Sequence, residues 1–428
     1  MKSMSKAVFA AALLSGVSGL VVAGPAVAKK KEEAPAGPTF KFSSPEIITA
    51  VQAAEPAVKA NNPAVAEPLV AQVEALAKNE DDQYAAAVLR SQLEQQKIAA
   101  ATAAGQQVDR SKQIAAFNAL LNSAKTPQPA KADTALSLGI LYYNSRQYQQ
   151  AVTYFTQAQQ LGSTEPNLSA NLVRARMQAG DASGGLAELT KLIDTQTQQK
   201  GKADEELYRF ALSRTIQAKD GAATLSWMRK YLAAYPTPKN WRDMIKIYGL
   251  QQGSFLTLSK AQSLDLYRLM RASGALADEY DYMAYADAAN SVGIPWEAKT
   301  VITDGRAKGK VPATGSSVQL MTLVNSRIAA EGSLASLETK SKAAADGKLA
   351  VQTADAQLGS GAYAKAADLY RVALQKGGVN AAEANLRLGI ALAMSGDKAG
   401  AKSAFGAVTG SPSADVAALW STYVDLSA

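Results

Sequence analysis

The fold of this chain is decided at residues 132–165, which read ADTALSLGILYYNSRQYQQAVTYFTQAQQLGSTE. The apolar residues recur at helical spacing on both sides of a short polar turn, so the stretch predicts two antiparallel helices. Gly139 and Ala151 are small where the two helix backbones would approach each other. Tyr142 and Phe155 are large enough to fill the space beside them. One hairpin cannot bury its apolar face alone, so this one predicts neighbours of the same kind.

The residue types in this stretch match a known repeat signature. The matching positions are Leu138, Gly139, Tyr142, Tyr148, Ala151, Phe155 and Ala158. At this spacing the stretch resembles one tetratricopeptide repeat. The resemblance implies an all-α fold, specifically an α-solenoid of antiparallel helix pairs, and a protein that binds a partner rather than an enzyme.

Two further repeats are predicted near the C-terminus. Ala366 and Tyr370 belong to the first of them, and Gly389, Ala401 and Phe405 belong to the second. The two alanines lie 35 residues apart, as do the two aromatic residues, so the repeats are in register. The last helix is predicted to cap the stack with three residues, Trp420, Tyr423 and Leu426.

Apolar periodicity and breaker residues divide the chain into six segments. They are a signal peptide (1–28), a flexible lead-in (29–45), degenerate helical repeats (46–131), tetratricopeptide-like repeats (132–235), divergent aromatic-rich helical repeats (236–346), and C-terminal tetratricopeptide repeats with the capping helix (347–428). In the divergent segment the helices are predicted at Pro238–Leu250, Lys260–Ala272, Glu279–Ser291 and Pro295–Lys308, followed by one long helix or a pair broken at Gly332.

The N-terminus has the pattern of an export signal. Lys2 and Lys6 precede the apolar run Ala7–Val22, and Ala26–Ala28 forms a small-x-small cleavage site. A single anchoring helix is the alternative, which the short run with its glycines and serines disfavours. The style of the signal is bacterial, so we expect a periplasmic protein, held near the outer membrane only through a partner and without a transmembrane segment after cleavage.

Composition excludes several classes of function. The chain has 45 Lys and Arg against 37 Asp and Glu, a formal net charge of +8, with both signs mixed along the sequence. This is not the clustered basic surface of a nucleic-acid-binding protein. There is no His and no Cys, which removes the usual general base, the thiolate nucleophile and most transition-metal sites. We therefore expect no catalysis, no metal and no cofactor.

One helix face of the first two repeats is a candidate partner-binding row. It consists of Leu136, Ile140, Tyr143, Asn144, Arg174 and Met177. Tetratricopeptide domains that clamp a peptide carboxylate place Lys and Asn on this row. Here Leu136 and Ile140 stand instead, so that clamp is absent. The mixed row suits an amphipathic helix or an extended segment, but it is equally compatible with packing against a neighbouring part of the chain.

A second candidate surface is the cluster of aromatic residues at 227–296. Its members are Trp227, Tyr231, Tyr235, Trp241, Tyr248, Tyr267, Tyr280, Tyr282, Tyr285 and Trp296. Such residues on a concave surface would anchor a peptide or a glycan, with Trp241 as the residue to test. The alternative is core packing, which the i, i+4 spacing of Trp227 and Tyr231 favours.

Two other patterns have simpler explanations than catalysis. The acids Asp278, Glu279 and Asp281 lie where a helix is predicted to begin, and acids favour the positive end of the helix dipole. The stretch Leu358–Gly361 looks faintly like a phosphate loop, but no Gly-Lys-Ser/Thr follows it, so it is predicted to be the turn of a repeat.

A longer resemblance covers most of the chain. YPTPKNWRD at 235–243 and LYRLMRASG at 266–274, with Asp281-Tyr282 and Gly293 after them, resemble a family of exported proteobacterial tetratricopeptide proteins of uncharacterised function. This resemblance implies an envelope location and a scaffold role, and it transfers no catalytic residue. The expected partner is another envelope protein or peptide. Peptidoglycan or another polysaccharide, bound through the aromatic cluster, is the alternative.

Overall fold

The computed structural model describes residues 40–427, and all regular structure in them is helical. They form twenty-one α-helices and one π-helical turn, so the predicted all-α fold is confirmed. The chain divides into two compact units, Met1–Glu188 and Leu189–Ala428, and the division falls inside α8 (Ala182–Lys200). The predicted signal peptide (1–28) and the lead-in up to residue 39 lie outside the described residues.

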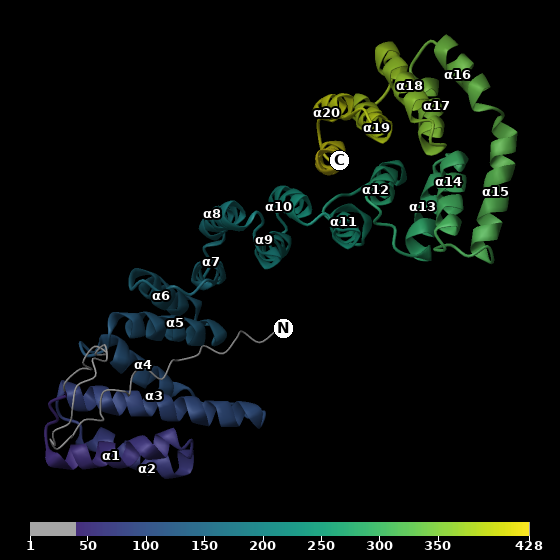
Figure 1. The fold of residues 1–428 in the computed structure, drawn as a ribbon. Coiled ribbons are helices and arrows are strands. Elements are labelled where there is room, and N and C mark those ends of the chain that lie inside the picture. The colour runs from purple at the N-terminus through teal and green to yellow at the C-terminus, as the bar shows by residue number, and fades with distance from the viewer. Residues whose placement is uncertain (1–39, 428) are drawn as a thin grey trace, which may run out of the picture. The chain divides into compact units, whose positions relative to one another are not determined.

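Unit 1 is a stack of helical hairpins, visible as successive pairs in Figure 1. Its helices are α1 (Pro45–Lys59), α2 (Pro63–Leu76), α3 (Glu80–Ala103), α4 (Ser111–Asn122), α5 (Gln128–Asn144), α6 (Tyr148–Gln160), α7 (Leu168–Gln178) and the beginning of α8. Each helix packs against the next along the chain, from α1–α2 through α6–α7. This is the α-solenoid that the repeat signature predicts.

The α5–α6 hairpin is built as its sequence predicts. A Cβ atom added to Gly139 would lie 2.4 Å from Cδ1 of Phe155, closer than real atoms approach. Glycine is therefore required where the Phe155 ring lies against α5. Leu138, Ala151 and Ala158 are fully buried around this contact, in an apolar core of unit 1.

The end of the predicted flexible lead-in is ordered. The Lys41 backbone N–H donates to Oδ2 of Asp81 at 2.7 Å, and the Ser43 N–H donates to Oδ1 of Asp82 at 3.0 Å. The Phe40 ring stacks on Tyr84 with 5.8 Å between ring centroids. The composition of 29–45 suggested a loose linker, whereas acids in the first turn of α3 hold residues 41 and 43 by their backbone.

Unit 2 contains the remaining helices. They are α9 (Glu205–Gln217), α10 (Gly221–Ala234), α11 (Pro238–Ile245) with a π-helical turn (Lys246–Leu250), α12 (Lys260–Ala272), α13 (Glu279–Ser291), α14 (Pro295–Ala307), α15 (Ser316–Glu331), α16 (Leu334–Ala343), α17 (Lys348–Gly359), α18 (Tyr363–Lys376), α19 (Ala381–Met394), α20 (Lys398–Gly406) and α21 (Ser413–Leu426). The helices predicted between 238 and 308 agree with these bounds to within one residue. The expected break falls at Gly332, where φ is +84°.

The C-terminal repeats use the same hairpin contact as α5–α6. A Cβ atom on Gly389 would lie 2.4 Å from Cε1 of Phe405, which repeats the contact between Gly139 and Phe155. In the preceding hairpin Ala354 and Tyr370 hold the equivalent positions, and both are fully buried. The predicted register of the two repeats is therefore confirmed.

The last helix does more than cap the stack. α21 packs on α19 and α20, as a cap would, but it also contacts α10 and α12 near the start of unit 2. The Trp420 indole N–H donates to the Asp265 carbonyl at 2.9 Å, and the Tyr423 hydroxyl donates to the Ala272 carbonyl at 3.2 Å. Unit 2 therefore curves back on itself, and in Figure 1 the C-terminus lies beside α12.

Of the helices between residues 40 and 427, none is both long enough and apolar enough to cross a membrane.

Candidate functional site

The predicted partner-binding row of unit 1 is divided between core and surface. Leu136 belongs to the apolar core, and Met177 is buried against Gly185 of α8. Asn144 is exposed. Ile140, Tyr143 and Arg174 are half-buried. Part of the row therefore serves packing, and the binding role of the remainder stays a prediction.

The α5–α6 hairpin carries four half-buried tyrosines, of which Tyr143 belongs to this row and Tyr142 lies on the other face of α5. Tyr142 stacks on Tyr154 with 5.2 Å between centroids and 2° between ring planes. Tyr143 meets Tyr148 edge to face at 5.5 Å. The Tyr154 hydroxyl donates to Oδ1 of Asn118 at 2.7 Å, and burial raises the pKa of this tyrosine. Tyr154 was missed from the sequence, where only its place on the second helix could have indicated a pairing with Tyr142.

The aromatic cluster of unit 2 is mostly core. Six of its members are buried, namely Trp227, Tyr231, Trp241, Tyr248, Tyr282 and Tyr285. Trp241 is 3% exposed and meets the Tyr423 ring edge to face at 6.3 Å. Tyr280, by contrast, is 72% exposed. The burial supports the packing interpretation, because a ring must present a free face to stack on a sugar.

The interior of unit 2 contains a network of buried charges that the sequence did not reveal. Arg268 on α12 binds Glu297 on α14 through two hydrogen bonds, Nε to Oε1 at 2.8 Å and Nη2 to Oε2 at 2.6 Å. Its Nη1 donates to Asp265 at 2.6 Å. The Tyr285 hydroxyl donates to Oε1 of Glu297 at 2.6 Å. Burial raises the pKa of Tyr285 well above its ordinary value, so the phenol stays protonated and donates.

A second arginine extends the network toward the C-terminal repeats. Arg387 on α19 donates to Asp355 on α17 at 3.0 Å and to Asp265 at 3.4 Å. The Tyr370 hydroxyl donates to the other Asp355 oxygen at 2.5 Å. Because these charges pair with one another out of water, the network ties α12, α14, α17 and α19 together in one arrangement.

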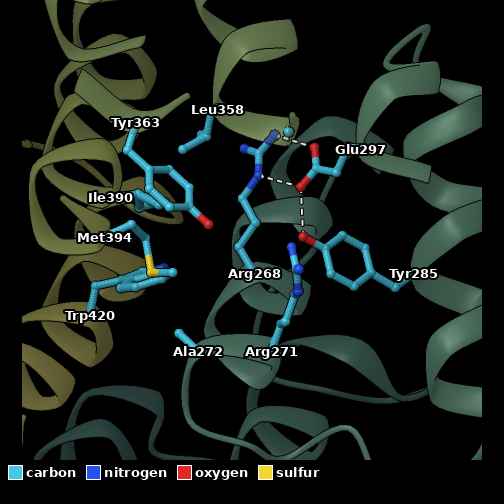
Figure 2. Close-up of a pocket in the computed structure, with 11 residues that line it drawn as sticks. Arg268, Arg271, Ala272, Tyr285, Glu297, Leu358, Tyr363, Ile390, Met394 and Trp420 are labelled. Carbon is cyan, nitrogen blue, oxygen red and sulfur yellow. Dashed lines mark hydrogen bonds and ion pairs between the residues drawn. The ribbon is translucent and has the colours of Figure 1, made fainter. Parts of the chain in front are cut away.

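A pocket lies directly beside this network and is drawn in Figure 2. One side of it carries Arg268, Arg271, Tyr285 and Glu297. The other side is mostly apolar, with Leu358, Ile390, Met394 and Trp420, and it includes Tyr363, whose hydroxyl points toward Arg268. The pocket volume is about 30 Å³, room for two water molecules or one small functional group. Helices between α12 and α21 contribute these side chains, so the pocket exists only when unit 2 is closed.

Gly359 makes one wall of this pocket possible. A Cβ atom there would lie 2.5 Å from Cβ of Glu297, so glycine lets the end of α17 approach the beginning of α14. The following residues turn the chain into α18, with φ of +88° at Gly361. The resemblance of Leu358–Gly361 to a phosphate loop is thus explained by a repeat turn, as predicted.

The acids at the start of α13 also behave as predicted. Asp278 is the N-cap, and its Oδ1 accepts the Asp281 N–H at 3.1 Å. Asp281 in addition binds Arg242 through two hydrogen bonds, at 2.6 Å and 3.0 Å. Within the described part of the chain no group of three or more acidic, His or Cys side chains could hold a metal ion.

One sequence signal could have found the buried network. Asp265 and Arg268 lie in α12, among Leu264, Leu266 and Leu269. A helix that is apolar on most of its circumference is a buried helix, and charges on it must find partners inside the protein. The partner Glu297 lies 29 residues away, at the start of another helix, and nothing local in the sequence identifies it.

Comparison with known proteins does not assign the chain to a family. No family model matches it, and no curated protein matches it. It is similar to the solved structure of the pentatricopeptide repeat protein PPR10 from maize, with 14% identity and a TM-score of 0.27, over 86% of this chain and 59% of that one. It is also similar to the apo form of RapI, with 12% identity and a TM-score of 0.18, over 77% of this chain and 97% of that one. Both scores are low, so neither likeness indicates what this chain binds.

Proposed function

We propose that this chain is a non-catalytic scaffold of the bacterial envelope that holds a protein or peptide partner on the α5–α6 hairpin of unit 1. The observation that carries the proposal is one face of α5, on which the half-buried Ile140 and Tyr143 lie with the exposed Asn144, with the Tyr148 ring against Tyr143. Tyrosine combines a large apolar ring with a polar end, which suits a surface that is wet when free and covered when bound.

The ring pair on this face favours binding because it is already ordered. The Tyr143 ring is held by Tyr148, which it meets edge to face at 5.5 Å. A partner that covers such rings loses little side-chain entropy on their account, so more of the interaction energy appears as affinity. The half-buried position also leaves part of each ring available for contact.

The envelope location rests on the N-terminal pattern and on the resemblance to exported proteobacterial proteins. Cell fractionation tests it directly. The chain is expected in the fraction released when the outer membrane is opened, shortened by cleavage after Ala28. A full-length chain in the cytosolic fraction would refute the location and leave the binding proposal standing.

The absence of catalysis is supported by how the buried acids of unit 2 are occupied. Both Glu297 oxygens accept hydrogen bonds from Arg268 or Tyr285, and both Asp355 oxygens accept from Tyr370 or Arg387. A carboxylate whose two oxygens both accept hydrogen bonds inside the protein is not presented to a substrate.

A comparative pull-down tests the binding surface. The immobilised chain is exposed to envelope extract, first without crosslinker and then with it, beside the variant Asn144→Arg and the control Gln160→Arg. Both positions are exposed and lie on the same hairpin. A partner that the wild type and the control retain, and that Asn144→Arg loses, supports the proposal. Retention of the same proteins by all three would place the binding surface elsewhere, and capture of none would refute a stable partner.

A further inference from the structure

We propose that the pocket beside the charge network of unit 2 binds a carboxylate group, held by the guanidinium of Arg271 and the hydroxyl of Tyr363. The inference goes beyond the proposed scaffold function and does not depend on it, because the pocket belongs to unit 2 and the proposed partner surface belongs to unit 1.

The donors of the pocket are not all occupied. Each of the three nitrogens of Arg268 already donates to Glu297 or Asp265. Arg271 is different, because its single hydrogen bond runs from Nε to Asp304 and is long, at 3.4 Å. Among the described residues, neither its terminal nitrogens nor the Tyr363 hydroxyl makes a hydrogen bond. Figure 2 shows the Arg271 end and this hydroxyl directed into the pocket.

These donors are also partly withdrawn from water. The Arg271 side chain is 26% exposed, and Tyr363 is half-buried. A charged donor in such a place gains more from an anionic acceptor than an exposed one does. Tyr363 begins α18, whose N-terminus no side chain caps, so the positive end of a helix dipole lies at the same edge of the pocket.

The charges that line the pocket favour an anion. Two arginines and one glutamate line it. The glutamate is not available to Arg271, because Oε1 of Glu297 accepts from Arg268 and Tyr285 and Oε2 accepts from Arg268. Asp304 accepts only from Nε of Arg271, so an external carboxylate would supply an acceptor for its two terminal nitrogens.

Size and the apolar wall define the rest of the ligand. A pocket with room for about two water molecules admits a carboxylate group. The carbon next to the carboxylate would contact Ile390, Met394 and Trp420. The ligand is therefore a small aliphatic acid, or the carboxylate end of a peptide whose remainder stays outside.

Ligand-observed NMR on the purified chain tests this with two pairs of probes. Propionate is compared with propionamide, and N-acetyl-alanyl-alanine with its C-terminal amide. At least one acid is expected to bind and its amide to bind at least tenfold more weakly, since an amide lacks the charge that strengthens hydrogen bonds to arginine. Tighter binding of propionate would identify a free acid as the ligand class, and tighter binding of the peptide acid would identify a chain end.

Variants locate the site. Arg271→Gln is expected to weaken acid binding about tenfold or more, Arg271→Lys to restore part of it, and Tyr363→Phe to weaken it about threefold. The matched controls are Arg371→Gln on α18 and the exposed Tyr280→Phe. In both, the affinity for the acid should stay within about twofold of the wild-type value. Thermal melting of each variant shows whether it is folded. Equal binding of acids and amides, no binding of either acid, or an affinity that a folded Arg271→Gln leaves unchanged would overturn the proposal.

Discussion

The α5–α6 hairpin of unit 1 and the α17–α18 hairpin of unit 2 have the same helix packing but differ in the aromatic residue at its centre. In each, a small residue on the first helix faces an aromatic ring 16 residues later, Gly139 with Phe155 and Ala354 with Tyr370. Phe155 contributes only apolar surface. Tyr370 adds a hydroxyl that binds Asp355, which in turn binds Arg387 on the next repeat.

The difference shows how a repeat can acquire polar chemistry without losing its packing. One oxygen atom on the ring lets the hairpin join a charge network whose members lie far apart along the chain, as Asp265 and Arg387 do at 122 residues. The main charge cluster of unit 1 spans less of the chain, since Arg90 binds Glu67, Glu74 and Glu94 within 23 residues and Lys112 binds Glu67 over 45. Neighbouring helices thus hold unit 1 together, whereas unit 2 is also held by its own closure.

The largest effect is expected from removing the arginine at the centre of the network. Arg268→Met leaves Glu297 and Asp265 as buried carboxylates without their main partner, so the free energy of unfolding should fall by about 3–5 kcal/mol. Urea unfolding measures this fall. Arg371→Met breaks an exposed ion pair with Asp368 and should change stability by at most about 1 kcal/mol. Similar losses in the two variants would mean that the buried network has no special weight.

The aromatic residues of unit 2 sharpen the contrast between packing and surface. Trp241→Ala removes a buried ring and is expected to lower the free energy of unfolding by about 3–4 kcal/mol. Tyr280→Ala, at an exposed position, should change it by about 0.5 kcal/mol or less. Sedimentation with purified sacculi is the decisive second measurement. Sacculus binding that a folded Trp241→Ala variant specifically loses would restore the glycan interpretation.

Exchanging the rings of the two hairpins tests the comparison most directly. Tyr370→Phe removes one hydrogen bond to a buried carboxylate and should cost about 1.5–3 kcal/mol. Phe155→Tyr should cost about 1–2 kcal/mol, because its hydroxyl enters an apolar core with no partner. Both losses are read from denaturant midpoints. A neutral Tyr370→Phe variant would show that Arg387 alone satisfies Asp355 and that the added oxygen has no role in stability.

The smallest expected effect is the loss of folding stability at low pH through Glu67. Burial acts to raise the pKa of Glu67, but hydrogen bonds from Lys97, Arg90 and Lys112 outweigh it and lower the pKa from 4.5 to about 2. This stabilisation is complete above pH 4.5 and is lost as pH falls toward 2. Because the side chain is about one-third exposed, the loss should amount to only about 1 kcal/mol. Protection of the amides in α2–α4 against hydrogen exchange should fall as the pH falls from 4.5 to 2. The Glu67→Gln variant should show no such pH-dependent loss of stability.

Local contacts were predictable from the sequence and distant ones were not. The contact between Gly139 and Phe155 follows from spacing within one repeat, and the helices from Pro238 to Ala307 follow from apolar periodicity. The binding row was less well placed. Met177 lies on the side of α7 that packs on Gly185, because degenerate repeats keep the hydrophobic frame without the residues that fix which face is outward.

The pocket could not have been predicted, for a physical reason. Arg271 and Tyr363 line the same pocket because unit 2 curves over several successive hairpins. Curvature of a solenoid is the sum of small rotations between repeats, and a single sequence does not state these rotations. The closing contact between Trp420 and Asp265 joins residues 155 positions apart for the same reason.

That closing contact also determines when unit 2 becomes complete during synthesis. An array held only by neighbours can fold one hairpin at a time as the chain emerges from the ribosome. The carbonyl of Asp265, by contrast, has its hydrogen-bond donor only after Trp420 has been synthesised, 155 residues later. Until then the part of α12 that Trp420 and Tyr423 contact stays open to water. A chain that stops before α21 would remain in that open state. Unit 2 can therefore close only when the whole chain up to its last helix has been made.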